Sequence, residues 1–224
     1  MIAFFLVAHL AADFILQPYW LVQRKRGWNG LLIHGGIVLA CMLALAFIAP
    51  RWLALWPAML AITGIHVATD WWKVHHGDAL FPHPIYGFLL DQCIHIATII
   101  GVLYVALPAF RLWNVHTLPC GYIIWSAAGY IVAAFATPIA VMVWLDPVAR
   151  YGALAGWARM RSFVVGAVVL SLVLSASTLA LPATLVGMVI ATQWPQSKHP
   201  LDKPLGTLVV IGVSALTGVS LLLL

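Results

Sequence analysis

The chain contains no glutamate, so all six of its acidic residues are aspartates. Charged residues make up only 8% of its 224 residues, whereas soluble domains contain roughly 25%. Hydrophobic residues make up 64%, and the mean hydropathy is +1.04. This scarcity of charge excludes an ordinary soluble domain, because nothing outside the apolar segments is long enough to bury a soluble core. The sequence predicts a single integral-membrane domain over residues 1–224.

Cysteine is also scarce, and its distribution excludes two classes of small domain. Cys41, Cys93 and Cys120 are far apart and form neither a CxxC motif nor another metal-ligand spacing. They therefore indicate neither a disulfide framework nor a zinc finger. The net charge of +5 does not form a basic stripe either. The basic residues fall between hydrophobic segments, where the positive-inside bias explains them. Membrane lipid is thus an expected partner and nucleic acid is not.

Apolar stretches of about 20 residues, enough to cross a bilayer, recur along the chain. They predict an all-α polytopic membrane protein with about seven transmembrane helices. A four-helix core would occupy residues 1–107, and C-terminal helices would occupy 120–224. The expected spans are 2–22, 29–49, 53–72, 86–107, 120–145, 162–181 and 205–224. The apolar piece 183–194, directly after Pro182, is too short to span and predicts a half-helix or re-entrant return.

Basic residues in alternate connections set the expected orientation. The run 24–26, Lys73 and the Arg159–Arg161 region would lie in the cytoplasm, which places the N-terminus outside a bacterial inner membrane. Residues 73–84 are expected to form a short histidine-rich cytoplasmic loop. The first segment lacks a basic start and an A-x-A-like cleavage site, so it predicts a retained helix rather than a signal peptide.

Three of the six aspartates stand four residues from a histidine inside apolar segments. The pairs are His9 with Asp13, His66 with Asp70 and Asp91 with His95, and a lone His34 lies between the first two pairs. Residues four apart share one face of a helix. A charge at the bilayer centre costs roughly 2.5–3.5 kcal/mol or more, so ionisable residues there need partners and mark functional sites.

The helical rise of about 1.5 Å per residue sorts these side chains by depth. The expected layers are Asp13, His34, His66 and Asp91 in the middle, His9 and His95 deeper, and Gln17 and Asp70 at the cytoplasmic rim. Asp13 reaches its layer only if the first helix loses regular geometry near Pro18. Four helices then converge on one level of the inner leaflet.

Imidazole and carboxylate together suit zinc and other first-row divalent ions. The predicted ligands of one or two neighbouring zinc ions are His9, Asp13, His34, His66, Asp70, Asp91 and His95. Asp70 or Asp13 would act catalytically by taking a proton from metal-bound water. Three residues beside these faces, Gln17, Lys73 and Gln92, would support the ligands or contact substrate. A helix–helix hydrogen bond is the expected task of Gln92.

Four motifs in order resemble a bacterial membrane family catalogued as domain of unknown function 3307. They are A-H-L-A-A-D-F-I-L-Q (8–17), L-L-I-H (31–34), H-V-A-T-D-W-W-K (66–73) and D-Q-C-I-H (91–95). The resemblance covers about residues 1–105 and implies a polar intramembrane site built from these motifs. It implies no reaction. More distantly, the arrangement is similar to membrane-bound metal-dependent hydrolases related to zinc phospholipases.

These observations favour a metal-dependent hydrolase acting on a lipid or other amphiphilic phosphoester at the cytoplasmic leaflet. Three alternatives remain open at this point. Intramembrane Asp/His chains also form proton relays in ion-coupled transporters. Two histidines on facing helices can ligate haem in an electron-transfer subunit. Polar side chains can also simply join helices in a structural subunit. The sequence leaves the oligomeric state unknown.

Overall fold

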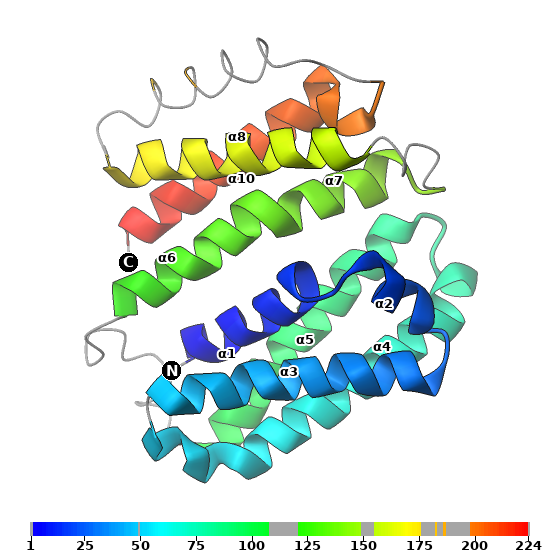
Figure 1. Ribbon diagram of the computed structural model, residues 1–224, viewed down its shortest axis with the longest axis vertical. Coiled ribbons are helices and arrows are strands. Elements are labelled where there is room, and N and C mark those ends of the chain that lie inside the picture. Colours follow the sequence, from blue (N-terminus) through cyan, green and yellow to red (C-terminus); the bar gives the residue numbers. More distant parts are fainter. Residues whose placement is uncertain are drawn as a thin grey trace. The chain divides into compact units, whose positions relative to one another are not determined.

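The computed structural model describes residues 2–48, 50–107, 121–148, 155–175, 182, 186 and 198–223. Every regular element in these ranges is a helix, which confirms the predicted all-α class (Figure 1). Five helical stretches are long and apolar enough to cross a membrane. They are Trp52–Gly77, Pro84–Ala106, Gly121–Leu145, Gly156–Ser175 and Pro204–Leu222. Ile2–Ile15 and Trp28–Ala44 are shorter apolar helices, and the predicted piece 183–194 lies, except for residue 186, outside the described residues.

The chain forms two compact units, Met1–Trp125 and Ser126–Leu224. The first unit contains α1 (Ile2–Leu10), the π-helical turn η1 (Ala11–Ile15), α2 (Tyr19–Arg24), α3 (Trp28–Ile48), the 3-10 turn η2 (Pro50–Leu55), α4 (Trp56–Leu80) and α5 (Pro84–Ala106). Within this unit α1 packs against α3 and α5, and α4 packs against the same two helices. The four helices therefore form a bundle around a shared core, which includes Phe5, Met42, Ile62 and Leu103.

The first predicted span, 2–22, is not one continuous helix. The chain passes from η1 through an irregular stretch at Leu16–Pro18 into α2, and Pro18 has extended geometry with φ −68° and ψ 156°. Proline disfavours helical geometry at the residue before it, so the break falls where Pro18 requires it. The backbone N–H of Leu16 donates to the carbonyl of Ala11 at 2.8 Å, the wider repeat of a π turn. Asp13 lies within this turn.

The prediction that residues 73–84 form a loop is wrong for most of these residues. Helix α4 continues to Leu80, so His75 and His76 are helical, and only residues 81–83 connect α4 with α5. No proline occurs in the sequence between the middle of α4 and Pro82. Charged and polar residues end a membrane span but not a helix, because the backbone hydrogen bonds continue into the aqueous layer. Hydropathy therefore locates the membrane boundary and misses the helix end.

The second unit contains the rest of α6 (Gly121–Ile131), the π turn η4 (Val132–Ala136), α7 (Thr137–Leu145), α8 (Ala155–Ser175), the 3-10 turn η7 (Pro200–Asp202) and α10 (Pro204–Leu222). Helix α8 packs on α10 and on η4. Gly166 permits the close approach to η4, since a Cβ there would lie 2.5 Å from the carbonyl oxygen of Ala133. A buried apolar cluster that includes Val165, Val169 and Ile211 fills this unit.

Arg161 is not the cytoplasmic loop charge that the sequence predicts. It lies in α8, because this helix begins before the predicted span 162–181, and it is only 2% exposed. Its Nε lies 2.7 Å from Asp202 Oδ1, and its Nη2 donates to the carbonyl of Leu201 at 2.6 Å and to Thr207 Oγ1 at 2.8 Å. The planar guanidinium satisfies several acceptors at once. This arginine therefore joins α8 to η7 and α10 inside the second unit.

Candidate metal centre

The first unit brings all seven sequence-predicted ligands into one buried polar cluster. Helix α1 with η1 supplies His9 and Asp13, α3 supplies His34, α4 supplies His66 and Asp70, and α5 supplies Asp91 and His95. The residue exposures are 2% for His9, 0% for His34, 2% for His66, 3% for Asp70, 4% for Asp91 and 2% for His95. The Asp13 side chain is 7% exposed. The helical spacing explains this convergence, since each pair lies on one face of its helix and every such face points into the bundle.

Four of these side chains direct one atom each at a common point, and we name them the His34 cluster: His34, His66, Asp13 and Asp70. His34 Nε2 lies 3.0 Å from His66 Nε2, 3.2 Å from Asp13 Oδ1 and 3.6 Å from Asp70 Oδ2. His66 Nε2 lies 3.6 Å from each of the same two carboxylate oxygens. Asp70 was expected at the rim, but its carboxylate lies inside this cluster.

The spacing of the His34 cluster suits a metal ion held by imidazole and carboxylate atoms. Ligands at bond lengths of about 2.0–2.1 Å around a tetrahedral ion are separated by about 3.3–3.4 Å. The five separations between 3.0 and 3.6 Å bracket that value. Hydrogen bonds alone do not account for the convergence, because a ring nitrogen has at most one proton to donate. His34 Nε2 nevertheless has three acceptor-capable atoms within 3.6 Å.

A second group of ligand atoms adjoins the first, and we name it the His95 cluster: Asp70, Asp91 and His95. His95 Nε2 lies 3.2 Å from Asp91 Oδ1 and 3.8 Å from Asp70 Oδ1. The three residues each offer one ligand atom, all within 4.8 Å of one another. The rings of His66 and His95 stack at a centroid distance of 3.9 Å, so the two clusters are in direct contact.

Two lysines neutralise part of the carboxylate charge. Lys25, which is 6% exposed, donates to Asp70 Oδ2 at 2.7 Å and to Gln17 Oε1 at 2.8 Å. Lys73 donates to Asp91 Oδ2 at 2.7 Å, and its side chain is 32% exposed. Lys25 is the functional residue that sequence reasoning missed. Lys25 belongs to the basic run 24–26. From sequence alone, a buried lysine in such a run cannot be distinguished from an exposed one that only sets membrane topology.

Gln92 connects α5 with α1, as the sequence predicts. Its amide nitrogen donates to Asp13 Oδ2 at 3.4 Å and to Asp91 Oδ2 at 3.2 Å, while its Oε1 lies 3.3 Å from His9 Nε2. His9 is the least engaged of the predicted ligands, because its nearest carboxylate contact is 3.8 Å, from Nδ1 to Asp13 Oδ1. Its Nε2 bonds to Gln92, which in turn donates to Asp13 of the His34 cluster. His9, Asp13 and His66 also form an alternative set of metal ligands.

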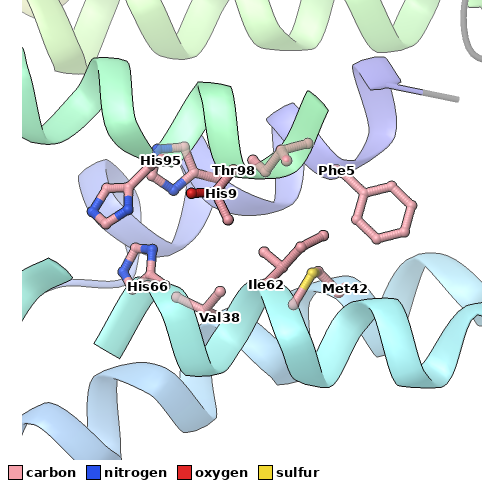
Figure 2. A pocket seen from close by; sticks show the side chains of 9 residues that line it. Phe5, His9, Val38, Met42, Ile62, His66, His95 and Thr98 are labelled. Carbon is pink, nitrogen blue, oxygen red and sulfur yellow. The ribbon is translucent and has the colours of Figure 1, made fainter. Parts of the chain in front are cut away.

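An apolar wall closes one side of the site. A small cavity of about 10 Å³, room for roughly one water molecule, lies against the imidazoles of His9, His66 and His95. Figure 2 shows these three rings at one end of the cavity and Phe5, Ile62 and Met42 at the other. Neither Lys25 nor Lys73 is among the residues that line this cavity.

The comparisons with known proteins identify a family without a known activity. A family model described as "Protein of unknown function (DUF3307)" matches residues 1–119, which include every residue of both clusters and both lysines. No curated protein and no solved structure matches the chain.

Proposed function

This chain belongs to the DUF3307 family, and we propose that it is an integral-membrane, metal-dependent hydrolase acting on a lipid or other amphiphilic phosphoester. The observation that carries the proposal is the His34 cluster, in which two imidazole nitrogens and two carboxylate oxygens from three different elements make five contacts of 3.0–3.6 Å. Buried polar side chains that only joined helices would pair donor with acceptor. Here His34 Nε2 meets His66 Nε2 and two carboxylate oxygens, more acceptors than its single proton can serve.

The residues divide into holding and reacting roles. His34, His66, Asp70 and Asp13 would hold a zinc ion. A bound divalent ion lowers the pKa of water toward about 7. Asp13 would accept the proton of the attacking water, because it lies on the short η1 turn and its Oδ2 accepts a long hydrogen bond of 3.4 Å from Gln92.

The reaction would be an ordinary ester hydrolysis. The water oxygen bonds to phosphorus, the ester P–O bond breaks, and the proton held by Asp13 passes to the leaving alkoxide. Lys73 is the partly exposed cation of the site and would meet the phosphate of the incoming substrate. The cytoplasmic leaflet follows from the basic run 24–26 at the same end of the bundle.

The proposed topology has seven transmembrane helices and one short return segment. The five long apolar helices supply five of them, and the shorter helices Ile2–Ile15 and Trp28–Ala44 supply two. The N-terminus would lie outside the inner membrane, and 183–194 would return the chain to the cytoplasmic side before α10. Short first helices suit this arrangement, because the centre must lie near one membrane surface to reach water.

The test is metal content together with hydrolysis in the full chain purified in detergent. We expect at least one zinc ion per chain by elemental analysis, and release of a phosphorylated or dephosphorylated product from short-chain phosphatidic acid or phosphatidylglycerol in mixed micelles. His66→Ala should reduce zinc by at least tenfold and abolish hydrolysis. His76→Ala is the matched control, because His76 lies on the same helix but is exposed.

Each alternative has its own outcome. Protein that binds no metal after loading with zinc would eliminate the hydrolase. Metal binding with solute flux in proteoliposomes and no hydrolysis would establish a transporter instead. A haem Soret band in the purified protein would establish electron transfer instead. The haem alternative does not explain the three carboxylates of the clusters, because haem is ligated by axial side chains such as histidine.

A further inference from the structure

The carboxylate of Asp70 faces the two clusters with different oxygens. Its Oδ2 lies 3.6 Å from the Nε2 atoms of His34 and His66. Its Oδ1 lies 3.8 Å from His95 Nε2 in the other cluster. A carboxylate in this position can bind one ion through each oxygen, as in two-metal sites whose ions lie roughly 3.5–4 Å apart.

The His95 cluster contains buried polar atoms that have no hydrogen-bond partner. His95 Nε2, His95 Nδ1 and Asp91 Oδ1 are all without one, although the two residues are 2% and 4% exposed. His95 Nε2 and Asp91 Oδ1 approach to 3.2 Å without the alignment of a hydrogen bond. Leaving a buried polar atom unsatisfied costs about 1–3 kcal/mol. His95 Nε2 and Asp91 Oδ1, which face each other, are suited to binding a shared cation.

We propose that Asp70 bridges two divalent cations, the first in the His34 cluster and the second held by Asp70, Asp91 and His95. This inference rests on the proposed hydrolase and deepens it, because the two ions would have different tasks. The His34 cluster offers four protein ligands, and the His95 cluster offers three. The second ion therefore keeps an open coordination position, as catalytic ions do.

The open position would receive a phosphoryl oxygen of the substrate. Lys73 Nζ lies 2.7 Å from Asp91 Oδ2, so a phosphate at the second ion would also be near this ammonium group. The three carboxylates and two lysines of the site have a formal charge of −1 with neutral imidazoles. Two divalent ions make the site strongly cationic, which favours an anionic ligand. The substrate class is thus a phosphate ester whose phosphate binds directly to metal.

The experiment counts manganese ions in the detergent-purified full chain after chelation and reloading with Mn²⁺. We expect two ions per wild-type chain and one per chain in His95→Ala. Asp91→Asn, which preserves the shape of the side chain, should also bind one ion per chain. It replaces His95→Ala in the experiment if that variant does not fold. His75→Ala, an exposed histidine on α4, should keep two. Electron paramagnetic resonance provides a second measurement, because two ions sharing a carboxylate broaden each other's signal and a single ion gives a resolved six-line spectrum.

The outcomes separate this inference from the proposed function. One ion in the wild type with an unbroadened spectrum overturns the second site and leaves the hydrolase standing. No ion at all overturns both. Loss of both ions in a folded His95→Ala or Asp91→Asn variant also overturns the inference, because it shows a single shared site.

Discussion

At the scale of single residues, Lys25 has the most sensitive position in the site. Its ammonium group is buried and donates to the same Asp70 oxygen that faces the His34 cluster. Removing one partner of a buried ion pair leaves an uncompensated charge. The lysine therefore stabilises the metal-free form and would compete with the proposed cation for Asp70, while its bond of 2.8 Å to Gln17 Oε1 gives the ammonium group a second acceptor.

Lys25→Met tests this competition. We expect the metal-free variant to be destabilised by about 3–5 kcal/mol, because Asp70 becomes an unpaired buried carboxylate. Zinc should raise its unfolding temperature more than it raises that of the wild type, since the ion then replaces the missing ammonium group. Thermal unfolding in detergent with and without zinc measures both effects. Arg26→Met, which removes the exposed charge next to Lys25, is the control, and equal behaviour of the two variants would contradict the role of Lys25.

At the scale of helices, the connection between α2 and α3 positions Lys25. Gly30, in the first turn of α3, lies so close to the backbone of Arg24 and Lys25 that an added Cβ would overlap both residues. Gly36, two turns further along α3, has open space around it. The first glycine is thus required by packing, whereas the second has no steric requirement.

Gly30→Ala and Gly36→Ala form a matched pair in one helix. Gly36→Ala should be neutral or stabilising by up to about 1 kcal/mol, because alanine has the higher helix propensity. Gly30→Ala should displace the Lys25 backbone, lower stability by roughly 1–3 kcal/mol as overpacking does, and weaken zinc binding through Asp70. Unfolding temperature and a zinc titration measure the two effects. If Gly30→Ala behaves like Gly36→Ala, the close approach of α2 and α3 does not control the site.

At the scale of the whole molecule, the polar chemistry belongs to the first unit. Both clusters lie within Met1–Trp125, and the family match at residues 1–119 has nearly the same extent. The second unit contains a separate buried ion pair, Arg161 with Asp202, which holds its own elements together. In the described residues, clustered metal-ligand atoms occur in the first unit, whereas the second unit contains the Arg161–Asp202 pair.

The orientation of the whole chain is tested by cysteine labelling in intact cells. With the native cysteines replaced by serine, a cysteine at exposed Arg26 should react with an impermeant maleimide only after permeabilisation. A cysteine at exposed Pro50, at the other end of α3, should react without it. The physical reason is the excess of basic residues beside α2, which disfavours translocation of that end. The reverse pattern would place the metal centre at the outer face.

The sequence by itself determined the helical class and the composition of the site. Apolar segments require internally hydrogen-bonded backbone in lipid, and the spacing of four residues puts each His/Asp pair on one helix face. These two local rules bring the two members of each His/Asp pair onto one face of a buried helix. The break near Pro18 was also predictable, because it arises from a single proline ring.

Only the tertiary structure decided which ligand atoms meet and which charges are buried. Asp70, expected at the rim, contacts both His34 and His66, and Lys25 from the connection between α2 and α3 contacts the same carboxylate oxygen. Arg161 is buried because η7 and α10 supply its acceptors from about forty residues further along the chain. The rotation of packed helices and the contacts between distant segments depend on all side chains at the interface at once, so no local pattern encodes them.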